Sequence, residues 1–367
     1  MSINYSKIIE NDFEKPIYKD LHIKILNYLD IHNNCSFWDI IHFVGGSERR
    51  MIRLLNEMVE NKEIFIANDI VFKKNGKTIN CICDKCKGKT IICDEMFKNI
   101  FKQLTEIYEK KPKPTFIFDQ RPTNIQTTLN RCIYMLNRGD IFSKDVVLLG
   151  DDDLTGIAIA LTHFAKSVLV LDIDERLINY VNTIAREYNL NLSAIKYDAT
   201  TPLPNNLKNK FDTLLTDPTP EIKPFAIFVN KAISLTKNKA SLYFSIYSSA
   251  MNFDFGLQEV MTERKLHITD MLPYWTEYKN IKSLYKESDL NLFNKFNINI
   301  ENKICFTETF IRTTKTPQTK ILDVDFTSSD LFGKATKRVI ADSKNDVECL
   351  EKNDYLSKCL ETIKEEQ

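Results

Sequence analysis

The sequence has no excess of either charge and no long apolar run, and each absence excludes a class of protein. Lys and Arg together number 50, as do Asp and Glu, so no net charge draws the chain to nucleic acid or to an anionic membrane. No uninterrupted apolar segment approaches a membrane span, and residues 1–15 lack the pattern of a secretory signal. We therefore expect a cytoplasmic protein with no membrane partner, for which nucleic acid is not the expected ligand.

Most of the nine cysteines are scattered, as expected of small core residues in a reducing compartment, and only one group could form a metal site. That group comprises Cys81, Cys83, Cys86 and Cys93. Four thiolates can hold zinc tetrahedrally, but the second Cys-x2-Cys of a two-knuckle site is absent. A turn without metal is the favoured interpretation, and zinc is the alternative.

Residues 1–110 form a first predicted domain, a small α+β module. Apolar stripes predict two helices before Gly45-Gly46-Ser47, which breaks the chain and caps a third helix. The alternating segment EIFIANDIVFKK, residues 63–74, predicts a hairpin. Three helices and a hairpin are typical of a winged helix, a module that binds DNA or serves dimerisation and docking. Both uses stay open, and a homodimer through this module is the expected assembly.

Residues 115–324 alternate between apolar strands and amphipathic helices, and a Lys- and Pro-rich linker precedes them. This succession predicts an α/β fold, a Rossmann-like doubly wound parallel sheet with helices on both faces. The predicted strands cover residues 146–150, 167–173, 192–198, 211–217 and 240–247, with later strands from 267–275 and 303–313. Residues 325–367 are charged and weakly periodic, and we expect a tail with short helices.

Acidic residues follow each of the first four predicted strands. They are Asp151, Asp152 and Asp153 after Gly150, then Asp172 with Asp174, then Asp198, then Asp217. Because the carboxyl ends of parallel strands meet at one edge, where ligands bind, these acids should line one site. An acid about 20 residues beyond the first turn is where such sheets hold ribose hydroxyls, and Asp198 is placed to accept from an adenine amino group. Helix capping explains any one of them, but four in order are harder to explain that way.

This order resembles the class I S-adenosylmethionine-dependent transferase fold, in which a glycine-rich first turn receives the methionine portion. Here Asp152 stands where the second glycine would be. Two like charges about 4 Å apart repel by about 4 kcal/mol at a near-surface dielectric, roughly a thousandfold in affinity. The turn therefore disfavours a methionine carboxylate and favours a donor that has only an ammonium, decarboxylated S-adenosylmethionine.

The segments GDDDLT, FDQRPTN, LDIDERL and TDPTPE together resemble the branched-chain polyamine synthases, the N4-bis(aminopropyl)spermidine synthases of archaea and thermophilic bacteria. The resemblance covers most of the chain, and GDDD is its most specific part. It implies two successive aminopropyl transfers from decarboxylated S-adenosylmethionine to the secondary amine of spermidine. The implied by-product is 5′-methylthioadenosine, and no prosthetic group is implied.

The chemistry requires a base, because a polyamine nitrogen is protonated at neutral pH and must lose its proton before it attacks. We assign this role to Asp152, with Asp153 as the anchor of the donor ammonium by its register in the turn. Asp217 is expected to face the acceptor, and Asp151 to support the turn. Gly150, Asp153, Asp172, Asp174 and Asp198 form the expected donor site.

Further contacts with the polyamine are predicted around this centre. Asp119, Gln120 and Glu221 are candidates to bind the terminal ammonium groups. Trp275, after Tyr274, would supply a cation–π wall, although an aromatic core strand explains the pair at least as well. No role is assigned to Arg131 or Gln126, which belong to the helix before the first strand.

Two other functions fit parts of the pattern. A methyltransferase acting on an amino group of nucleic acid would use Asp217-Pro218 and the winged helix, and it would bind S-adenosylmethionine tightly. A transcriptional regulator with a degenerate transferase domain would bind DNA and show no turnover. The neutral charge of the chain disfavours both.

Overall fold

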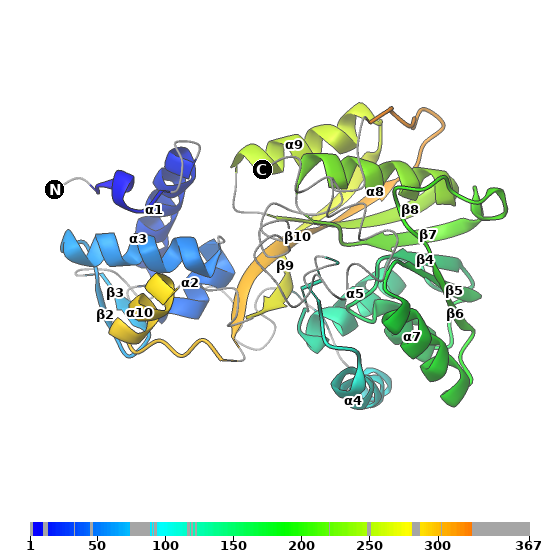
Figure 1. Ribbon diagram of the computed structural model, residues 1–367, viewed down its shortest axis with the longest axis horizontal. Helices are drawn as coiled ribbons and strands as arrows, with labels where there is room; N and C mark the ends of the chain where they lie inside the picture. Colours follow the sequence, from blue (N-terminus) through cyan, green and yellow to red (C-terminus); the bar gives the residue numbers. More distant parts are fainter. Residues whose placement is uncertain are drawn as a thin grey trace, which may run out of the picture. The chain divides into compact units, whose positions relative to one another are not determined.

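Figure 1 shows the chain as a computed structural model. It describes residues 3–9, 14–32, 34–44, 47–73, 89, 91, 94–115, 118, 120–121, 123–219, 221–247, 251–280, 287–301 and 303–324. The cysteine cluster (Cys81, Cys83, Cys86 and Cys93), Asp119 and the predicted tail 325–367 lie outside the described residues. No helix within the described ranges is long and apolar enough to cross a membrane.

The chain divides into two compact units. The first comprises Met1–Ile91, Tyr247–Asp254 and Leu272–Thr309, and the second comprises Ile92–Ile246, Phe255–Met271 and Phe310–Gln367. The helix that ends at Lys110 thus belongs to the second unit, and residues 272–309 return to the first. The domain boundaries at 110, 115 and 324 stay a prediction.

The first unit has the predicted α+β composition. Its elements are η1 (Tyr5–Lys7), α1 (Glu14–Ile31), β1 (Asn34–Ser36), α2 (Phe37–Val44), α3 (Glu48–Glu60), β2 (Phe65–Ala67), β3 (Ile70–Phe72) and α10 (Glu287–Lys295). The strands form an antiparallel sheet in the order β1-β3-β2. Asn68 and Asp69 have φ of 49° and 65° and close the predicted β2–β3 hairpin. These two positive φ values suit a tight hairpin turn.

A winged helix that binds DNA would need free positive charge on α3, which has three arginines. Ser47 caps the helix by accepting from the Arg50 amide, as the sequence predicts. The Arg53 guanidinium donates to both oxygens of Asp289 on α10, at 2.7 and 2.9 Å, and Arg50 lies 3.3 Å from Glu14. Two of the three arginine charges of this helix are therefore offset by acids of the same unit.

The second unit contains the predicted α/β sheet. Its helices are α4 (Glu95–Lys110), α5 (Ile125–Asn137), α6 (Thr155–Leu161), α7 (Glu175–Glu187), η3 (Asn205–Leu207), α8 (Ile222–Leu235) and most of α9 (Met251–Glu263). Its strands are β4 (Asp145–Leu149), β5 (Ser167–Asp172), β6 (Leu192–Lys196), β7 (Phe211–Thr216) and β8 (Thr236–Tyr247), followed by β9 (His267–Lys279) and β10 (Ile304–Thr314), which span both units.

These strands form one sheet in the order β6-β5-β4-β7-β8-β10-β9, in which β4 to β8 are parallel. The chain reverses its strand order at β4, and β4 and β7 are neighbours there. Helix α8 lies on one face of the sheet, and α5 and α7 lie on the other (Figure 1). The predicted doubly wound fold is confirmed, and the turns after β4, β5 and β7 meet at its carboxyl edge, where ligands bind in such sheets.

Candidate active site

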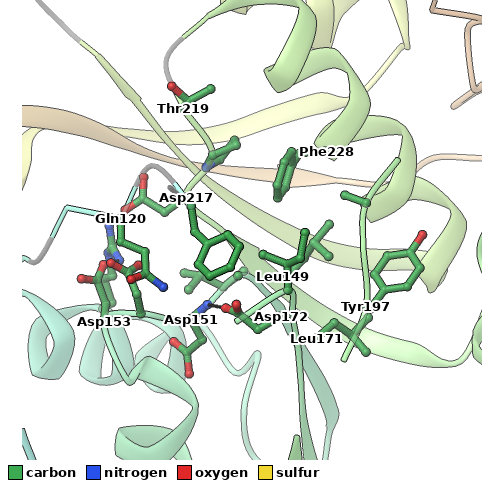
Figure 2. Close-up of a pocket in the computed structure, with 18 residues that line it drawn as sticks. Gln120, Leu149, Asp151, Asp153, Leu171, Asp172, Tyr197, Asp217, Thr219 and Phe228 are labelled. Carbon is green, nitrogen blue, oxygen red and sulfur yellow. Dashed lines mark hydrogen bonds and ion pairs between the residues drawn. The ribbon is translucent and has the colours of Figure 1, made fainter. Parts of the chain in front are cut away.

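A cavity with an empty volume of about 850 Å³, which includes space open to solvent, lies at this carboxyl edge (Figure 2). Its apolar walls are Phe118, Leu149, Leu171, Ile173, Tyr197, Ala199, Leu215, Pro218 and Phe228. The remaining lining residues are Gln120, Arg131, Gly150, Asp151, Asp152, Asp153, Asp172, Asp217 and Thr219. The cavity therefore has an apolar part suited to a flat aromatic group and an acidic part suited to cations.

The turn between β4 and α6 is shaped by backbone conformations that few side chains adopt. Gly150 has φ of +74°, and Leu154 has φ of +59° just before α6. Gly156 begins the packing of α6 on the sheet, where an added Cβ would lie 2.8 Å from Asp151 Oδ2 and 2.9 Å from Val170 Cγ2. The turn thus needs glycine where the chain leaves β4 and again where α6 meets the sheet.

Asp151 stabilises this turn from within. Its Oδ1 accepts from the Thr155 amide at 2.7 Å, and its Oδ2 accepts from the Gly156 amide at 2.9 Å. A carboxylate at a helix N-terminus satisfies amides that have no partner in the helix. Asp151 therefore caps the N-terminus of α6, and its supporting role in the reaction stays a prediction.

Asp172 connects the first turn to the second. Its Oδ2 accepts from the Asp151 amide at 3.0 Å, and its Oδ1 accepts from the Asp174 amide at 2.8 Å. Burial raises the pKa of Asp172 to about 6, against the effect of these hydrogen bonds. Since an ionised carboxylate has room for about four hydrogen bonds, Asp172 can still accept from a ribose hydroxyl.

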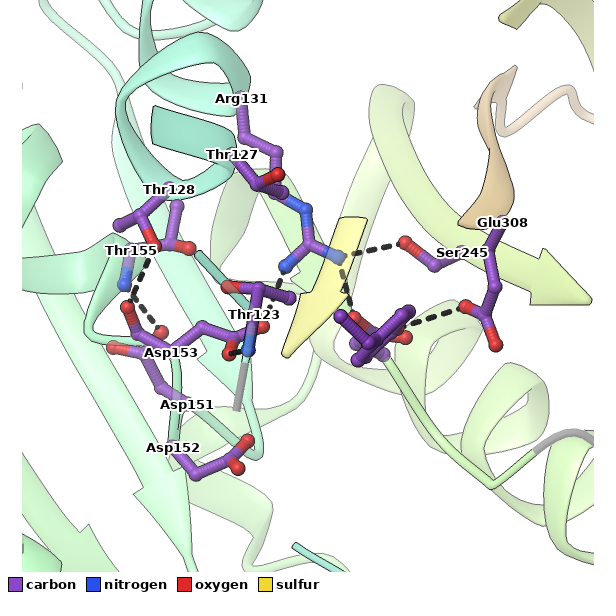
Figure 3. Close-up of polar contacts among 12 residues, drawn as sticks. Thr123, Thr127, Thr128, Arg131, Asp151, Asp152, Asp153, Thr155, Ser245 and Glu308 are labelled. Atoms are coloured by element: carbon purple, nitrogen blue, oxygen red, sulfur yellow. Dashed lines mark hydrogen bonds and ion pairs between the residues drawn. The ribbon is translucent and has the colours of Figure 1, made fainter. Parts of the chain in front are cut away.

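Asp153 and Asp217, predicted to bind donor and acceptor, share a buried guanidinium (Figure 3). Arg131 of α5 donates from Nη1 to Asp153 Oδ2 at 2.9 Å, and from Nη2 to Asp217 Oδ2 and to Ser245 Oγ, the latter at 2.9 Å. Asp153 Oδ1 also accepts from the Thr123 amide at 2.9 Å. The carboxylates predicted to anchor the donor and to face the acceptor are therefore held by this one cation.

Asp152 differs from the other acids of the turn. Its Oδ2 is buried and has no hydrogen-bond partner among the described residues. Burial, and after it the charge of Asp153, raises the pKa of Asp152 well above that of an ordinary carboxyl, while the Lys111 ammonium opposes the shift. Lys111 itself donates to the backbone carbonyl of Asp152 and lies 4.1 Å from the centre of the Tyr108 ring. A buried acceptor without a partner is costly unless a ligand supplies the donor.

Gln120 and Asp174 form a second polar group beside the cavity. Gln120 lines it, accepts from the Thr115 amide at 2.9 Å and donates to Asp174 Oδ2 at 3.0 Å. Asp174 also caps α7 and binds Arg176. Although burial raises the pKa of Asp174, the Arg176 and Gln120 hydrogen bonds lower it below the usual value. Asp174 therefore acts in the structure as a buried, ionised anchor for Gln120.

Other predicted site residues do not line the cavity. Asp198 accepts from the amide and hydroxyl of Thr200, at 2.8 and 2.7 Å, while its neighbours Tyr197 and Ala199 form the wall. Glu221 precedes α8, and Trp275 is a buried residue of β9 in the first unit. The buried position of Trp275 fits the core-strand alternative.

Three residues near the acids were not predicted. Arg131, Lys111 and Tyr108 lie on α5 and at the end of α4, outside the turns that carry the sequence motifs. A signal for Arg131 existed, since it follows Thr127 by one helical turn and precedes Met135 by another, on the face of α5 that is buried. A charged residue on such a face needs a buried partner.

Within the described part of the chain, no group of three or more His, Cys, Asp or Glu side chains is arranged to hold a metal ion.

The chain is similar in sequence to a family of polyamine synthases. Residues 99–335 match the family model described as the branched-chain polyamine synthase A C-terminal domain. The N(4)-bis(aminopropyl)spermidine synthase of Methanocaldococcus jannaschii is 28% identical over 282 residues, which cover 73% of this chain and 80% of that protein. The synthase of the same name from Thermococcus kodakarensis is 35% identical over 191 residues, 51% of this chain and 54% of that one.

A solved structure has the same fold. It is the branched-chain polyamine synthase of Thermus thermophilus in complex with N4-aminopropylspermidine and 5′-methylthioadenosine. It aligns with a TM-score of 0.69 at 20% identity and covers 87% of this chain and 91% of that chain. The alignment extends beyond the sheet domain to the greater part of the molecule.

Proposed function

The chain belongs to the branched-chain polyamine synthase A family, and from that membership and the geometry of the cavity we propose the reaction it catalyses. It is an aminopropyltransferase that moves aminopropyl groups from decarboxylated S-adenosylmethionine to the secondary amine of spermidine. The products are N4-aminopropylspermidine and N4-bis(aminopropyl)spermidine, with 5′-methylthioadenosine released at each step. The similar Thermus structure contains the mono-aminopropylated polyamine and that nucleoside.

The observation that carries the proposal is the unpartnered buried oxygen of Asp152 at the acidic end of the cavity. The apolar end, with Tyr197 and Phe228, suits an adenine ring, and Asp172 lies between the two ends as an acceptor for ribose. A nucleoside bound in this direction places its sulfur substituent toward the aspartate turn. A carboxylate there would be repelled, whereas an aminopropyl ammonium would be attracted.

The transfer step requires a deprotonated amine and an aligned carbon. The lone pair of the spermidine secondary nitrogen forms the new C–N bond as the C–S bond breaks. The electron pair of the C–S bond stays on sulfur and converts the sulfonium to a neutral thioether. The proton of the secondary ammonium passes to a carboxylate, for which we propose Asp152. Its raised pKa makes it a stronger base, and the positive charge of the bound polyamine favours the ionised form that can accept a proton.

The second transfer begins from a tertiary amine and gives a quaternary ammonium. That amine can bind in its neutral form, and the attack then releases no proton from the nitrogen. Acceleration in this step comes from alignment and from the negative charge of the cavity. We assign Asp217 to the acceptor side and Asp153 to the donor side, with Gln120, which lines the cavity, as a contact for a terminal ammonium.

The test is to incubate the purified protein with spermidine and decarboxylated S-adenosylmethionine and to follow products by mass spectrometry. Masses higher by one and two aminopropyl units, with one methylthioadenosine released per unit, are expected. A parallel incubation with S-adenosylmethionine and nucleic acid tests the methyltransferase alternative. Methylation there, without aminopropyl products, would overturn the proposal.

We also propose that the protein is a homodimer. Ile23 and Phe65 of the first unit are 58% and 55% exposed, and such apolar side chains are available for a partner surface. Sedimentation equilibrium should give twice the 42.7 kDa chain mass, and a monomer at micromolar concentration would contradict the assignment.

A further inference from the structure

Arg131 joins the ends of three consecutive strands at the carboxyl edge of the sheet. Asp153 follows β4, Asp217 follows β7 and Ser245 lies on β8, and the order of these strands in the sheet is β4-β7-β8. Arg131 is 1% exposed and also lines the cavity. Its guanidinium carbon lies 5.6 Å from the Phe310 ring centre, within the range of a cation–π contact.

We propose that Arg131 is a positioning residue of the aminopropyl transfer, which holds Asp153 and Asp217 in place and reserves Asp152 for the substrate. The inference rests on the proposed function of the same cavity. Arg131 takes one oxygen of Asp153 and one of Asp217, so those carboxylates have fixed orientations before any ligand binds. Figure 3 shows the guanidinium joined to Asp153, with Asp152 apart on the turn, and the same guanidinium donates to Asp217.

The charge arrangement explains why a cation is needed in a site that must attract cations. Five aspartates line the cavity, and like charges so close together and buried would resist ionisation. Arg131 offsets the charge at two of them, while the backbone amides of Thr155 and Gly156 satisfy Asp151, and those of Asp151 and Asp174 satisfy Asp172. Asp152 is left with the oxygen that has no partner among the described residues.

The planar shape of the Arg131 guanidinium is what allows it to hold two carboxylates at once. A guanidinium donates in several fixed directions at once, whereas an ammonium is a compact point charge. Lysine at position 131 would keep the charge but could not reach both carboxylates and Ser245 in the same geometry. Methionine would fill most of the volume and leave both carboxylates without the cation. The two substitutions therefore separate the effect of geometry from that of charge.

The experiment compares Arg131→Lys and Arg131→Met with wild type and with Arg264→Lys. Arg264 is a matched control, since it is also buried, at 3% exposed, but bonds Asn230 and the Val260 carbonyl on α9 and does not line the cavity. Each protein is assayed for kcat and KM with both substrates across pH 6 to 9. Titration calorimetry measures the affinities for methylthioadenosine and spermidine, and circular dichroism confirms the fold.

We expect Arg131→Lys to lower kcat by at least tenfold with an unchanged pH profile, and Arg131→Met to lower it further and move the acid limb to higher pH. Methylthioadenosine affinity should stay within about twofold of wild type, and spermidine affinity should not weaken, because no ligand contact is removed. Arg264→Lys should match wild type in every kinetic measurement. Arg131 variants with wild-type kcat, or with kcat and both affinities lost together in a folded protein, would overturn the positioning role.

The two proposals fail separately. A wild-type protein that forms no aminopropyl product would refute the proposed function. In that case the spermidine affinity still tests the positioning role of Arg131. Arg131→Met should bind spermidine at least as tightly as wild type, because the substitution removes a positive charge from the cavity. Weaker spermidine binding, with the fold intact, would contradict it.

Discussion

Asp152→Asn should reduce the preference of the protein for a donor without a carboxylate. The substitution keeps the shape of the side chain and removes the one turn charge whose buried oxygen has no partner among the described residues. A donor carboxylate placed 4 to 6 Å from Asp152 is repelled by about 3 to 4 kcal/mol at an effective dielectric of about 20. Removing that repulsion should narrow the ratio of the two affinities, decarboxylated over intact S-adenosylmethionine, by roughly a hundred- to a thousandfold.

The assay measures both dissociation constants by titration calorimetry at low and moderate salt, with methylthioadenosine as a reference that has neither charged group. Asp212→Asn provides a matched control. Asp212 lies on β7 near its amino end, away from the cavity, where it accepts from the Asp145 amide and pairs with Lys237. The control should leave the affinity ratio unchanged.

A wild-type protein that binds intact S-adenosylmethionine as tightly as the decarboxylated donor would show that Asp152 does not select the donor. The same conclusion would follow if Asp152→Asn left the ratio of the two donor affinities within about threefold of wild type while methylthioadenosine binding stayed normal. In either case the aspartate turn would not be the element that selects the donor.

Three further predictions follow from the same geometry. Asp152→Asn should lower kcat of the first transfer by about a hundredfold or more at saturating donor, and kcat of the second transfer much less, because the tertiary amine can bind in its neutral form and then releases no proton. Separate assays with spermidine and N4-aminopropylspermidine measure this, and equal losses would reject Asp152 as the base. The affinity for methylthioadenosine should be constant above about pH 6 and should decrease as the pH is lowered further. Burial raises the pKa of Asp172 to about 6, and protonation removes the carboxylate that accepts from ribose. An affinity that does not change between pH 5 and 8 would exclude Asp172 from the nucleoside site. Gly156→Ala should lower the free energy of unfolding by about 1–3 kcal/mol, because the added Cβ would lie under 3 Å from Asp151 and Val170. Urea unfolding measures the loss. An unchanged midpoint of the urea transition would show that α6 can shift to make room.

The sheet and the place of the cavity could be predicted because both depend on local patterns in chain order. Each strand reads as a short apolar run, and a parallel sheet brings the residues after those runs to one edge. Asp151, Asp152, Asp153, Asp172 and Asp217 accordingly line one cavity. Sequence order alone was enough to group them.

The partners of those acids could not be predicted in the same way. The pairing of Arg131 with Asp217 joins residues 86 positions apart, and it depends on how α5 crosses the sheet edge. The side chain of Asp198 could not be placed from the sequence either. It follows a strand as expected, but it accepts from the nearby Thr200, and its neighbours Tyr197 and Ala199 line the cavity in its place. The direction in which a carboxylate points is decided by its hydrogen-bond donors, which are local for Asp198 and distant in sequence for Asp217.

Asp151 and Gly156 also bear on how this family can diverge. The carboxylate of Asp151 occupies the space that a side chain at position 156 would need, and it satisfies the amide of that same residue. A relative that acquires a side chain at 156 must move or shorten the acid at 151, and one that loses the acid must find another cap for α6. The two positions are therefore expected to covary among homologous sequences, and a laboratory search for stable variants should recover changes at them as pairs.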